Sequence, residues 1–397
     1  ANHLIIKNIN NKYAENTYDE DGNLLSEENE YGYKSQYSYD VFGKKIKEVK
    51  PDGTSIKYTY DALGNKLTEN NNTFTYDSRN NVLSSKNKEG TVKNTYDAFN
   101  NKTSVRDTKG KKVSYVFNED NKVSNMKYGG VEVTYSYNDI GLLDTVKKDN
   151  SLVAKYEYNN RNEVIQLNQN NTITNKIYDD MGRVLSQKTS KDGKSVLDVA
   201  YRYDANDNVI KEIMDGQINT YEYDAYDELS KSSKYVNGKK VNTTYQHDVF
   251  GNQVENSSSE GKKVFKYNDK NQVESIETDK GRIKYRYDDN GNVSKKINDN
   301  GRVDLYTYDD LNQLTKLEQG QFIYDYKYDA ENERISQKKT DTKDYHYDQW
   351  YNYSEPLDVV GDLEIEDTFK NLKEQAKKKQ DNGKVCSRVL SDKYDVT

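Results

Sequence analysis

Short acidic runs are the residues of this sequence whose types and spacing first suggest chemistry, because carboxylate and amide oxygens are calcium ligands. The two strongest runs are residues 19–23 (DEDGN) and residues 288–292 (DDNGN). An EF-hand loop needs Gly at its sixth position and a bidentate Glu at its twelfth, whereas Gly is fourth in both runs. Turn formation explains residues of these types in this order, so we expect no metal site and no cofactor there.

Catalytic residue types show no arrangement typical of an enzyme. The three histidines, His3, His247 and His346, are widely spaced, and the single cysteine, Cys386, lies in a polar stretch. No Ser-His-Asp or Cys-His spacing and no glycine-rich phosphate loop occurs. We expect His247 to lie on a strand face rather than to bind a metal or act as a base. Asp and Glu are abundant enough to leave a glycosidase-like carboxylate pair open, but we expect no catalytic residue.

The elements that position these residues must form with few aliphatic side chains. Hydrophobic residues make up 32% of the 397 residues, and 37 residues are Tyr. Tyr rings are apolar with a polar end, so they suit half-exposed surfaces, and disordered chains are poor in them. The net charge of −7, with Lys and Glu interspersed, argues against nucleic-acid binding. No stretch has the ~20 apolar residues of a membrane-spanning helix.

We expect the chain to be a mature or excised piece of a longer protein. The sequence starts without Met, and residues 1–6 lack the parts of a signal peptide. A single cysteine allows no internal disulfide, which leaves the cellular compartment open.

One short unit, usually Tyr-Asp, recurs along nearly the whole chain. Twelve of the sixteen intervals between successive copies are 20 or 21 residues, which indicates a repeat architecture. The copies begin at Tyr18, Tyr39, Tyr60, Tyr76, Tyr96, Phe117, Tyr137, Tyr158, Tyr178, Tyr203, Tyr223, His247, Tyr267, Tyr287, Tyr308, Tyr328 and Tyr347.

Residues 58–67 (YTYDALGNKL) predict a β-hairpin. Tyr58 and Tyr60 are two positions apart and therefore share one face of a strand. Asp61 opens a type I turn, and Gly64, the fourth turn residue, takes the left-handed conformation of a three-residue hairpin loop. The same arrangement recurs at Tyr285, Tyr287, Asp288 and Gly291.

The turn chemistry is the same in the first sixteen copies. The first turn residue is Asp or Asn, and the fourth is Gly, Asn or Asp, which enter the left-handed region most easily. The fourth residues are Gly22, Gly43, Gly64, Asn80, Asn100, Asn121, Gly141, Asn162, Gly182, Asp207, Asp227, Gly251, Asn271, Gly291, Asn312 and Asn332. A looser second turn, such as residues 51–53, closes each unit and absorbs the irregular intervals. The seventeenth copy has Tyr351 at the fourth position, so regular hairpins are expected to stop near residue 350.

The pattern Tyr-x-Tyr-Asp-x-x-Gly-Asn-x-Leu resembles the YD repeats of the RHS-repeat family, which includes insecticidal toxin-complex shells, polymorphic and wall-associated toxins, and teneurin ectodomains. The match is best at residues 58–67 and 287–293 and covers about residues 13–350. The resemblance implies an all-β hairpin ribbon that spirals into a hollow shell, which in bacterial members commonly encloses a C-terminal toxic polypeptide. Members with cargo often end the core with Asp-Pro-Gly sequences linked to self-cleavage. Here Pro356 follows Glu and no Asp-Pro occurs, so self-cleaving aspartates are not carried over.

The size of the predicted ribbon also favours a hollow wall. Two strands in each of the sixteen regular units make about 32 strands, which at ~4.8 Å spacing give a ribbon about 150 Å long. Strands of about six residues make it about 20 Å wide. One turn would be about 50 Å across, whereas eight strands already make a barrel that side chains can fill. We therefore predict a curved sheet that encloses a space.

Two parts of the chain are expected, a YD-repeat β-shell segment at residues 1–352 and a non-repeat tail at residues 353–397. The spacing of apolar residues in the tail predicts an amphipathic helix over residues 362–380. These apolar residues are Leu363, Ile365, Phe369, Leu372 and Ala376. A cap, a tether and the remnant of an effector are the roles open to the tail.

Three functions are compatible with these patterns. The first is a non-catalytic structural segment of a secreted or cell-surface bacterial RHS-type protein, which encloses or presents its own C-terminal effector or cargo. The second is an adhesion module that binds cell-surface glycans through exposed Tyr, although ring packing across strands is the simpler role for these rings. The third is a toxin whose activity lies in the tail.

Overall fold

The structure is a computed structural model that describes residues 4–9 and 12–342, and the described residues form 33 β-strands. Two units divide the chain, the first made of residues 1–279 and 327–335 and the second of residues 280–326 and 336–397. The predicted tail at residues 353–397, its helix at 362–380 and the expected end of the hairpins near residue 350 lie outside the described residues. No helix in the described part of the chain is long and apolar enough to cross a membrane.

The first unit contains the strands from β1 to β27, and β32 and β33 have residues in both units. Its strands are β1 (Leu4–Ile9), β2 (Lys12–Tyr18), β3 (Leu24–Glu28), β4 (Lys34–Tyr39), β5 (Lys45–Val49), β6 (Ser55–Tyr60), β7 (Lys66–Glu69), β8 (Asn72–Tyr76), β9 (Val82–Asn87), β10 (Gly90–Tyr96), β11 (Lys102–Arg106), β12 (Lys112–Phe117), β13 (Val123–Tyr128), β14 (Val131–Tyr137), β15 (Leu143–Lys148), β16 (Ser151–Tyr158), β17 (Val164–Gln169), β18 (Thr172–Tyr178), β19 (Val184–Lys191), β20 (Lys194–Tyr203), β21 (Val209–Met214), β22 (Gln217–Tyr223), β23 (Leu229–Val236), β24 (Lys239–His247), β25 (Gln253–Ser258), β26 (Gly261–Tyr267) and β27 (Val273–Thr278). The remaining strands are β28 (Gly281–Tyr287), β29 (Val293–Ile297), β30 (Val303–Tyr308), β31 (Leu314–Gln319), β32 (Phe322–Tyr328) and β33 (Arg334–Asp341).

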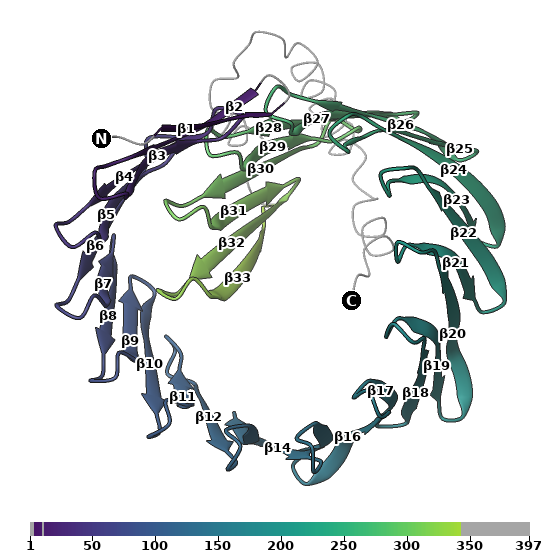
Figure 1. Ribbon diagram of the computed structural model, residues 1–397, viewed down its shortest axis with the longest axis horizontal. Coiled ribbons are helices and arrows are strands. Elements are labelled where there is room, and N and C mark those ends of the chain that lie inside the picture. The colour runs from purple at the N-terminus through teal and green to yellow at the C-terminus, as the bar shows by residue number, and fades with distance from the viewer. Residues whose placement is uncertain (1–3, 10–11, 343–397) are drawn as a thin grey trace, which may run out of the picture. The chain divides into compact units, whose positions relative to one another are not determined.

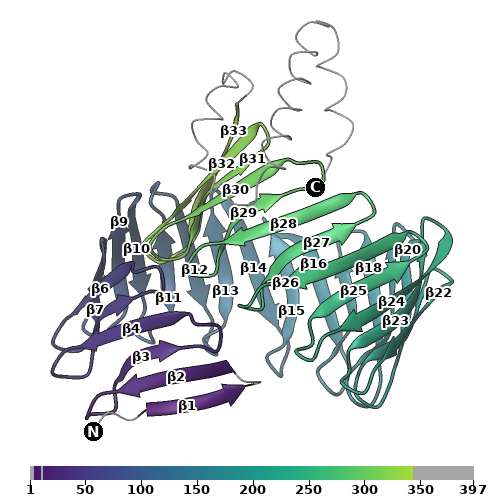
Figure 2. The ribbon, with the colours of Figure 1, turned by 90° about the horizontal axis from the view of Figure 1, so that it is seen from above.

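From β1 to β27, successive strands of the first unit pair with each other, and the pairs are antiparallel. Figures 1 and 2 show these strands side by side in chain order, along a ribbon that bends within the unit. In the second unit, β28 to β31 pair in the same sequential way. The predicted all-β ribbon of antiparallel hairpins is confirmed.

A one-residue irregularity accompanies fifteen of the Tyr-Asp turns and fixes where each of them lies in the ladder. In the hairpin of β6 and β7, Thr59 pairs with Thr68 and Tyr60 pairs with Lys66, so Leu67 is left over. An extra residue of this kind is a β-bulge, which increases local twist and bends the strand.

Burial in the described residues is thin, as the low aliphatic content predicts. The buried hydrophobic side chains are Ile56, Phe74, Val92, Ala154, Val199, Val241 and Ala330. Polar side chains such as Ser85 and Asn94 are equally buried, and most Tyr rings are half-buried. Stability must therefore come largely from ladder hydrogen bonds, Tyr packing and polar side-chain bonds rather than from one thick core.

One turn of the first unit lies against strands that are about 240 residues away in sequence. The carboxylate of Glu331 accepts hydrogen bonds from Ser85 (2.9 Å) and from the Asn94 amide (3.3 Å). The Asn87 amide donates to the carbonyl of Tyr328 at 3.0 Å. The turn at residues 328–333 is thus held by polar contacts to β9 and β10.

Candidate functional site

The repeated turn is built around a carboxylate that bonds to its own loop. The Gly64 N–H donates to the Asp61 carbonyl at 3.0 Å, and the Asp61 N–H donates to the Asn65 carbonyl at 2.9 Å. Oδ1 of Asp61 also accepts the N–H groups of Leu63 (2.9 Å) and Asn65 (2.8 Å). The loop therefore closes only when its first residue carries a short side-chain acceptor.

The fourth turn residue is left-handed in every one of the sixteen copies. Its φ is +82° at Gly64 and +88° at Gly291. Where the residue is not Gly, it is Asn or Asp with φ between +57° at Asn121 and +70° at Asp207. At Asp288, the carboxylate accepts N–H groups from Asn290 (3.1 Å) and Asn292 (2.8 Å), as in the other copies.

In several turns these bonds favour the ionised form of the first-position carboxylate. The side-chain bond from Asn65 lowers the pKa of Asp61, and its backbone bonds lower it further. A side-chain bond from the fifth turn residue is also the largest cause of a lowered pKa at Asp19, Asp77 and Asp97. Both oxygens of Asp19, in one of the two acidic runs, accept donors from its own turn.

In eleven copies, the Tyr of the Tyr-Asp pair bonds to the preceding repeat, which sequence reasoning did not foresee. The Tyr60 hydroxyl donates at 2.8 Å to the carbonyl of Lys45, two residues after the left-handed Gly43. Ten further residues make the equivalent bond: Tyr39, Tyr76, Tyr96, Tyr137, Tyr158, Tyr178, Tyr203, Tyr223, Tyr267 and Tyr308. Burial raises the pKa of each of these eleven hydroxyls, so they remain donors at neutral pH.

The first Tyr of the Tyr-x-Tyr pair has a different role. The Tyr58 hydroxyl donates to the Glu48 carboxylate at 3.3 Å, and the Lys45 ammonium lies 5.1 Å from the ring centroid. Burial raises the pKa of Tyr58 and, in the second unit, of Tyr285. These rings pack on the ribbon face beside charged neighbours, which is the packing role expected for them. Tyr287 ends β28 opposite Val293.

The fifth turn residue links each turn to the next turn along the edge. The Asn65 amide donates both to Asp61 Oδ2 (2.8 Å) and to Asn80 Oδ1 of the following turn (2.9 Å). Five further turn-to-turn bonds have the same form: Asn81 to Asn100, Asn101 to Asn121, Asn208 to Asp227, Asn252 to Asn271 and Asn292 to Asn312. Arg183 reaches Asp207 in the equivalent place at 2.5 Å.

Longer side chains at the fifth position face Gly at the fourth position of the next turn. A Cβ at Gly64 would lie 2.7 Å from the Lys44 ammonium, and a Cβ at Gly182 would lie 2.9 Å from a carboxylate oxygen of Glu163. Fifth and fourth positions are thus matched in size between many neighbouring turns, although Asn23 faces Gly43. Once successive turns are known to be adjacent, this pairing can be read from the sequence. Asn at the fifth position mostly precedes Asn or Asp at the next fourth position, and Lys or Glu precedes Gly.

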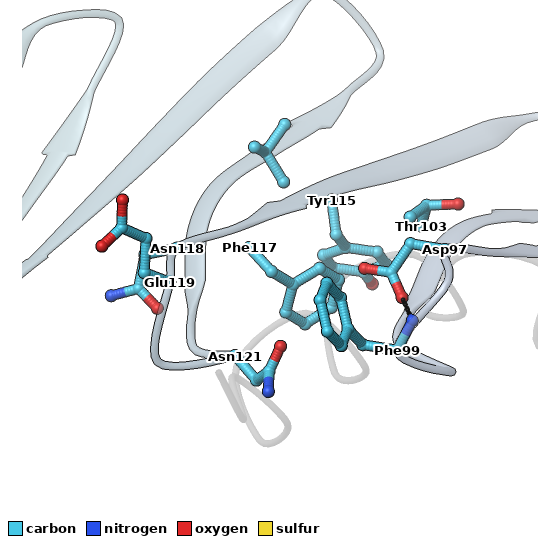
Figure 3. A pocket seen from close by; sticks show the side chains of 9 residues that line it. Asp97, Phe99, Thr103, Tyr115, Phe117, Asn118, Glu119 and Asn121 are labelled. Atoms are coloured by element: carbon cyan, nitrogen blue, oxygen red, sulfur yellow. Dashed lines mark hydrogen bonds between the residues drawn. The ribbon is translucent and has the colours of Figure 1, made fainter.

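One depression on the turn edge is lined by aromatic rings. It lies between the turns that begin at Asp97 and Asn118, has a volume of about 570 Å³, and is lined by Phe99, Tyr115 and Phe117 among others. Figure 3 shows these three rings gathered between the two turns. The Phe99 side chain is 76% exposed. An exposed ring beside polar turn groups has the chemistry of a sugar-stacking platform.

Comparisons with known proteins agree with the repeat and the fold. The family model described as RHS Repeat matches residues 18–55 and 287–321. A search of curated proteins finds no match. The chain is similar to the solved structures titled "Crystal Structure of TcdB2-TccC3-Cdc42" (TM-score 0.54, 12% identity) and "Crystal Structure of TcdB2-TccC3 without hypervariable C-terminal region" (TM-score 0.55, 13% identity).

The similarity to these structures extends over 86% and 85% of this chain, but over only 25% and 24% of theirs. The chain therefore spans about a quarter of the length of the solved structures it matches. At this identity the likeness concerns the fold, and that fold is the antiparallel hairpin ribbon seen here. The RHS Repeat model thus matches two regions of the chain, residues 18–55 and 287–321, and the solved structures share its fold.

Proposed function

We propose that the chain is a non-catalytic wall segment of a secreted bacterial RHS-type protein, which encloses or presents a C-terminal toxic polypeptide of the same protein. The observation that supports this most is the repeated linkage between neighbouring turns along the turn edge. In eleven copies a Tyr hydroxyl bonds to the preceding repeat, and at many turns the fifth-position side chain bonds to or packs on the following turn. Such linkage suits a long curved wall with thin burial, because each unit is stabilised by its neighbours.

The same linkage supports a structural role for the most repeated polar groups. The Asp61 carboxylate and the Tyr60 hydroxyl, for example, already take part in hydrogen bonds within the ribbon. A general base or nucleophile must instead be free to meet a substrate proton or a reacting atom.

Small-angle scattering of the purified chain tests the wall. A compact domain of this length has a radius of gyration of ~21 Å, and a curved wall should give a value clearly above that. Electron microscopy of the same sample should show a curved, hollow body. A radius of gyration near the compact value, or a solid rod in the images, would contradict the wall and indicate a filled solenoid.

Glycan adhesion is the second candidate, and the depression between the turns at Asp97 and Asn118 is the observation that favours it. Phe99→Ala should abolish binding on a glycan array if the exposed ring stacks on sugar. Phe42→Ala is the matched control, since Phe42 holds the same turn position, is 84% exposed and does not line the depression. Binding that survives both substitutions, or no binding by the unmodified chain, counts against adhesion.

We also propose that the repeat segment ends at residue 352 and that residues 353–397 form a separate tail. Deleting residues 354–397 should leave the melting temperature and the β-sheet circular dichroism of the repeats unchanged if the tail is a separate element. Loss of the β-sheet signal would instead make the tail a required cap, as terminal units of repeat proteins can be.

A further inference from the structure

The first and fifth residues of each turn lie close together, and their polar groups are matched in most copies. An Asp acceptor faces an Asn donor at Asp61 and Asn65. Where the fifth residue is Glu163, the first is Asn159, whose amide donates to the carboxylate at 2.6 Å. At Asp179 the fifth residue is an Arg, which forms an ion pair at 2.7 Å. In these three turns a donor therefore lies opposite the carboxylate.

The turn that begins at Asp224 breaks this match, because its fifth residue is Glu228. Oδ1 of Asp224 accepts the N–H groups of Tyr226 (2.8 Å) and Glu228 (3.0 Å), as in the other turns. A second carboxylate thus stands at the fifth position of a turn that begins with Asp, where Asp61 has an amide and Asp179 a guanidinium. Two carboxylates in contact repel each other unless a proton or a cation lies between them.

A second departure from the repeat lies at the same place. His247 replaces the Tyr whose hydroxyl, in eleven other copies, donates to the carbonyl of the preceding unit. Nδ1 of His247 lies 3.4 Å from Oε2 of Glu228, and the two side chains are 14% and 25% exposed. One ligand atom each from His247, Glu228 and Asp224 lie within 4.8 Å of one another.

Gly251 is the left-handed fourth residue of the following turn, and its lack of a side chain leaves room for Glu228 to reach His247. A Cβ at Gly251 would lie 2.7 Å from Oε1 of Glu228. The His, the Glu and this Gly come from two adjacent turns, joined by the hairpin of β23 and β24. The two departures and the glycine thus bring an imidazole and two carboxylates together at the turn edge.

We propose that Asp224, Glu228 and His247 bind a divalent transition-metal ion, with zinc as the preferred ion. One imidazole nitrogen and two carboxylate oxygens form a ligand set that zinc accepts, at distances of about 2.0–2.2 Å. Ligand atoms of a tetrahedral zinc site are then about 3.3–3.5 Å apart, which the His247 and Glu228 atoms already satisfy. The ion links the two turns where the Tyr hydroxyl bond is missing, and its fourth position is open to water or to a partner's ligand.

Isothermal titration of the full chain with zinc chloride tests the site, in a Cys386→Ser background that removes the one thiol. We expect one bound ion per chain and a rise in melting temperature that a chelator reverses, because a ligand stabilises the folded state it binds. His247→Tyr and Glu228→Asn both restore the common repeat residues, so these variants should fold. Each should weaken zinc binding at least tenfold.

Glu333→Asn is the matched control, because Asp329 and Glu333 are another acid pair at the first and fifth positions, without a His in the copy. There, burial raises the pKa of Asp329 and the carboxylates of Glu331 and Glu333 raise it further, so uptake of a proton relieves the repulsion. This control should leave zinc affinity unchanged. The proposal is overturned if millimolar zinc does not bind, or if it binds equally well to His247→Tyr.

Discussion

The two edges of the ribbon follow different rules. On the edge of the Tyr-Asp turns, one loop type recurs with a left-handed residue at the same position in sixteen copies. On the opposite edge, some turns have two successive residues with positive φ, such as Gly129-Gly130 and Asp149-Asn150. Others are three-residue loops that end in a left-handed Gly, such as Gly53 and Gly110.

Length variation is confined to the opposite edge. The hairpin strands β7 and β8 have 4 and 5 residues, whereas β19 and β20 have 8 and 10. The Tyr-Asp turns remain adjacent through this variation, because Tyr203 at the end of β20 still bonds to the carbonyl of Val184. The comparison teaches that one edge sets the alignment of the units and the other accommodates insertions.

The largest effect expected from the bonds of the Tyr-Asp turn edge is unfolding at alkaline pH. Burial raises the pKa of the edge hydroxyls, and it raises the pKa of Tyr221, on the ribbon face, to about 12. A folded-state pKa above the unfolded value of about 10 means that stability is full below pH ~10 and is lost as the pH rises through the folded pKa values. We expect cooperative loss of β-sheet circular dichroism between about pH 10 and pH 12, together with tyrosinate absorbance.

Tyrosinate absorbance that rises fully before the β-sheet signal changes would contradict this expectation. It would mean that the hydroxyl bonds of the turn edge contribute nothing to the stability of the ribbon.

The second largest effect on stability is expected from substituting the left-handed fourth residue of a Tyr-Asp turn. Gly64→Val should destabilise the chain by about 1–3 kcal/mol, because a β-branched residue is strained at a φ of +82°. Asn80→Gly is the control: it relieves strain at a φ of +64° but removes the bond from Asn65, so little net change is expected. Chemical denaturation should separate the two variants, and equal midpoints would refute the turn geometry.

The turn at Asp61 shows what could be predicted from the sequence and why the rest could not. The first residue accepts its hydrogen bonds, and the fourth takes its left-handed conformation, within one five-residue loop. Asp and Gly at these spacings therefore predict the loop directly. The bond from Asn65 to Asn80 joins residues 15 apart, and the bond from Asn81 to Asn100 joins residues 19 apart. Such bonds depend on strand lengths and on register, which the local pattern does not determine.

The cluster around His247 was missed for the same reason. Its histidine was expected to lie on a strand face, and the structure places it on a strand end, beside a Glu from the preceding turn. The signal was present in the sequence as two departures from the repeat, but only adjacency of the turns brings them together.

A smaller effect on stability is expected from removing or adding a single Tyr hydroxyl at the turn edge. Tyr60→Phe should cost about 1 kcal/mol, because the carbonyl of Lys45 loses its donor. Phe117→Tyr supplies the complementary test in one of the two copies that lack a hydroxyl, and it should stabilise the chain by about 0.5–1 kcal/mol. If the two substitutions change the denaturation midpoint in the same direction, the Tyr hydroxyl does not join the units.

The smallest effect is expected from lengthening the variable edge. Inserting Gly-Ser between Gly129 and Gly130 should cost less than about 1 kcal/mol, because loop-closure entropy grows slowly with length and this edge already accepts several turn types. The same insertion after Ala62 interrupts the loop that Asp61 closes and removes the alignment of Asn65 with Asn80, so it should cost several times more. Thermal melts of the two variants compare the edges directly. Equal losses would show that both edges set the register, and the distinction between an aligning edge and an accommodating edge would then be wrong.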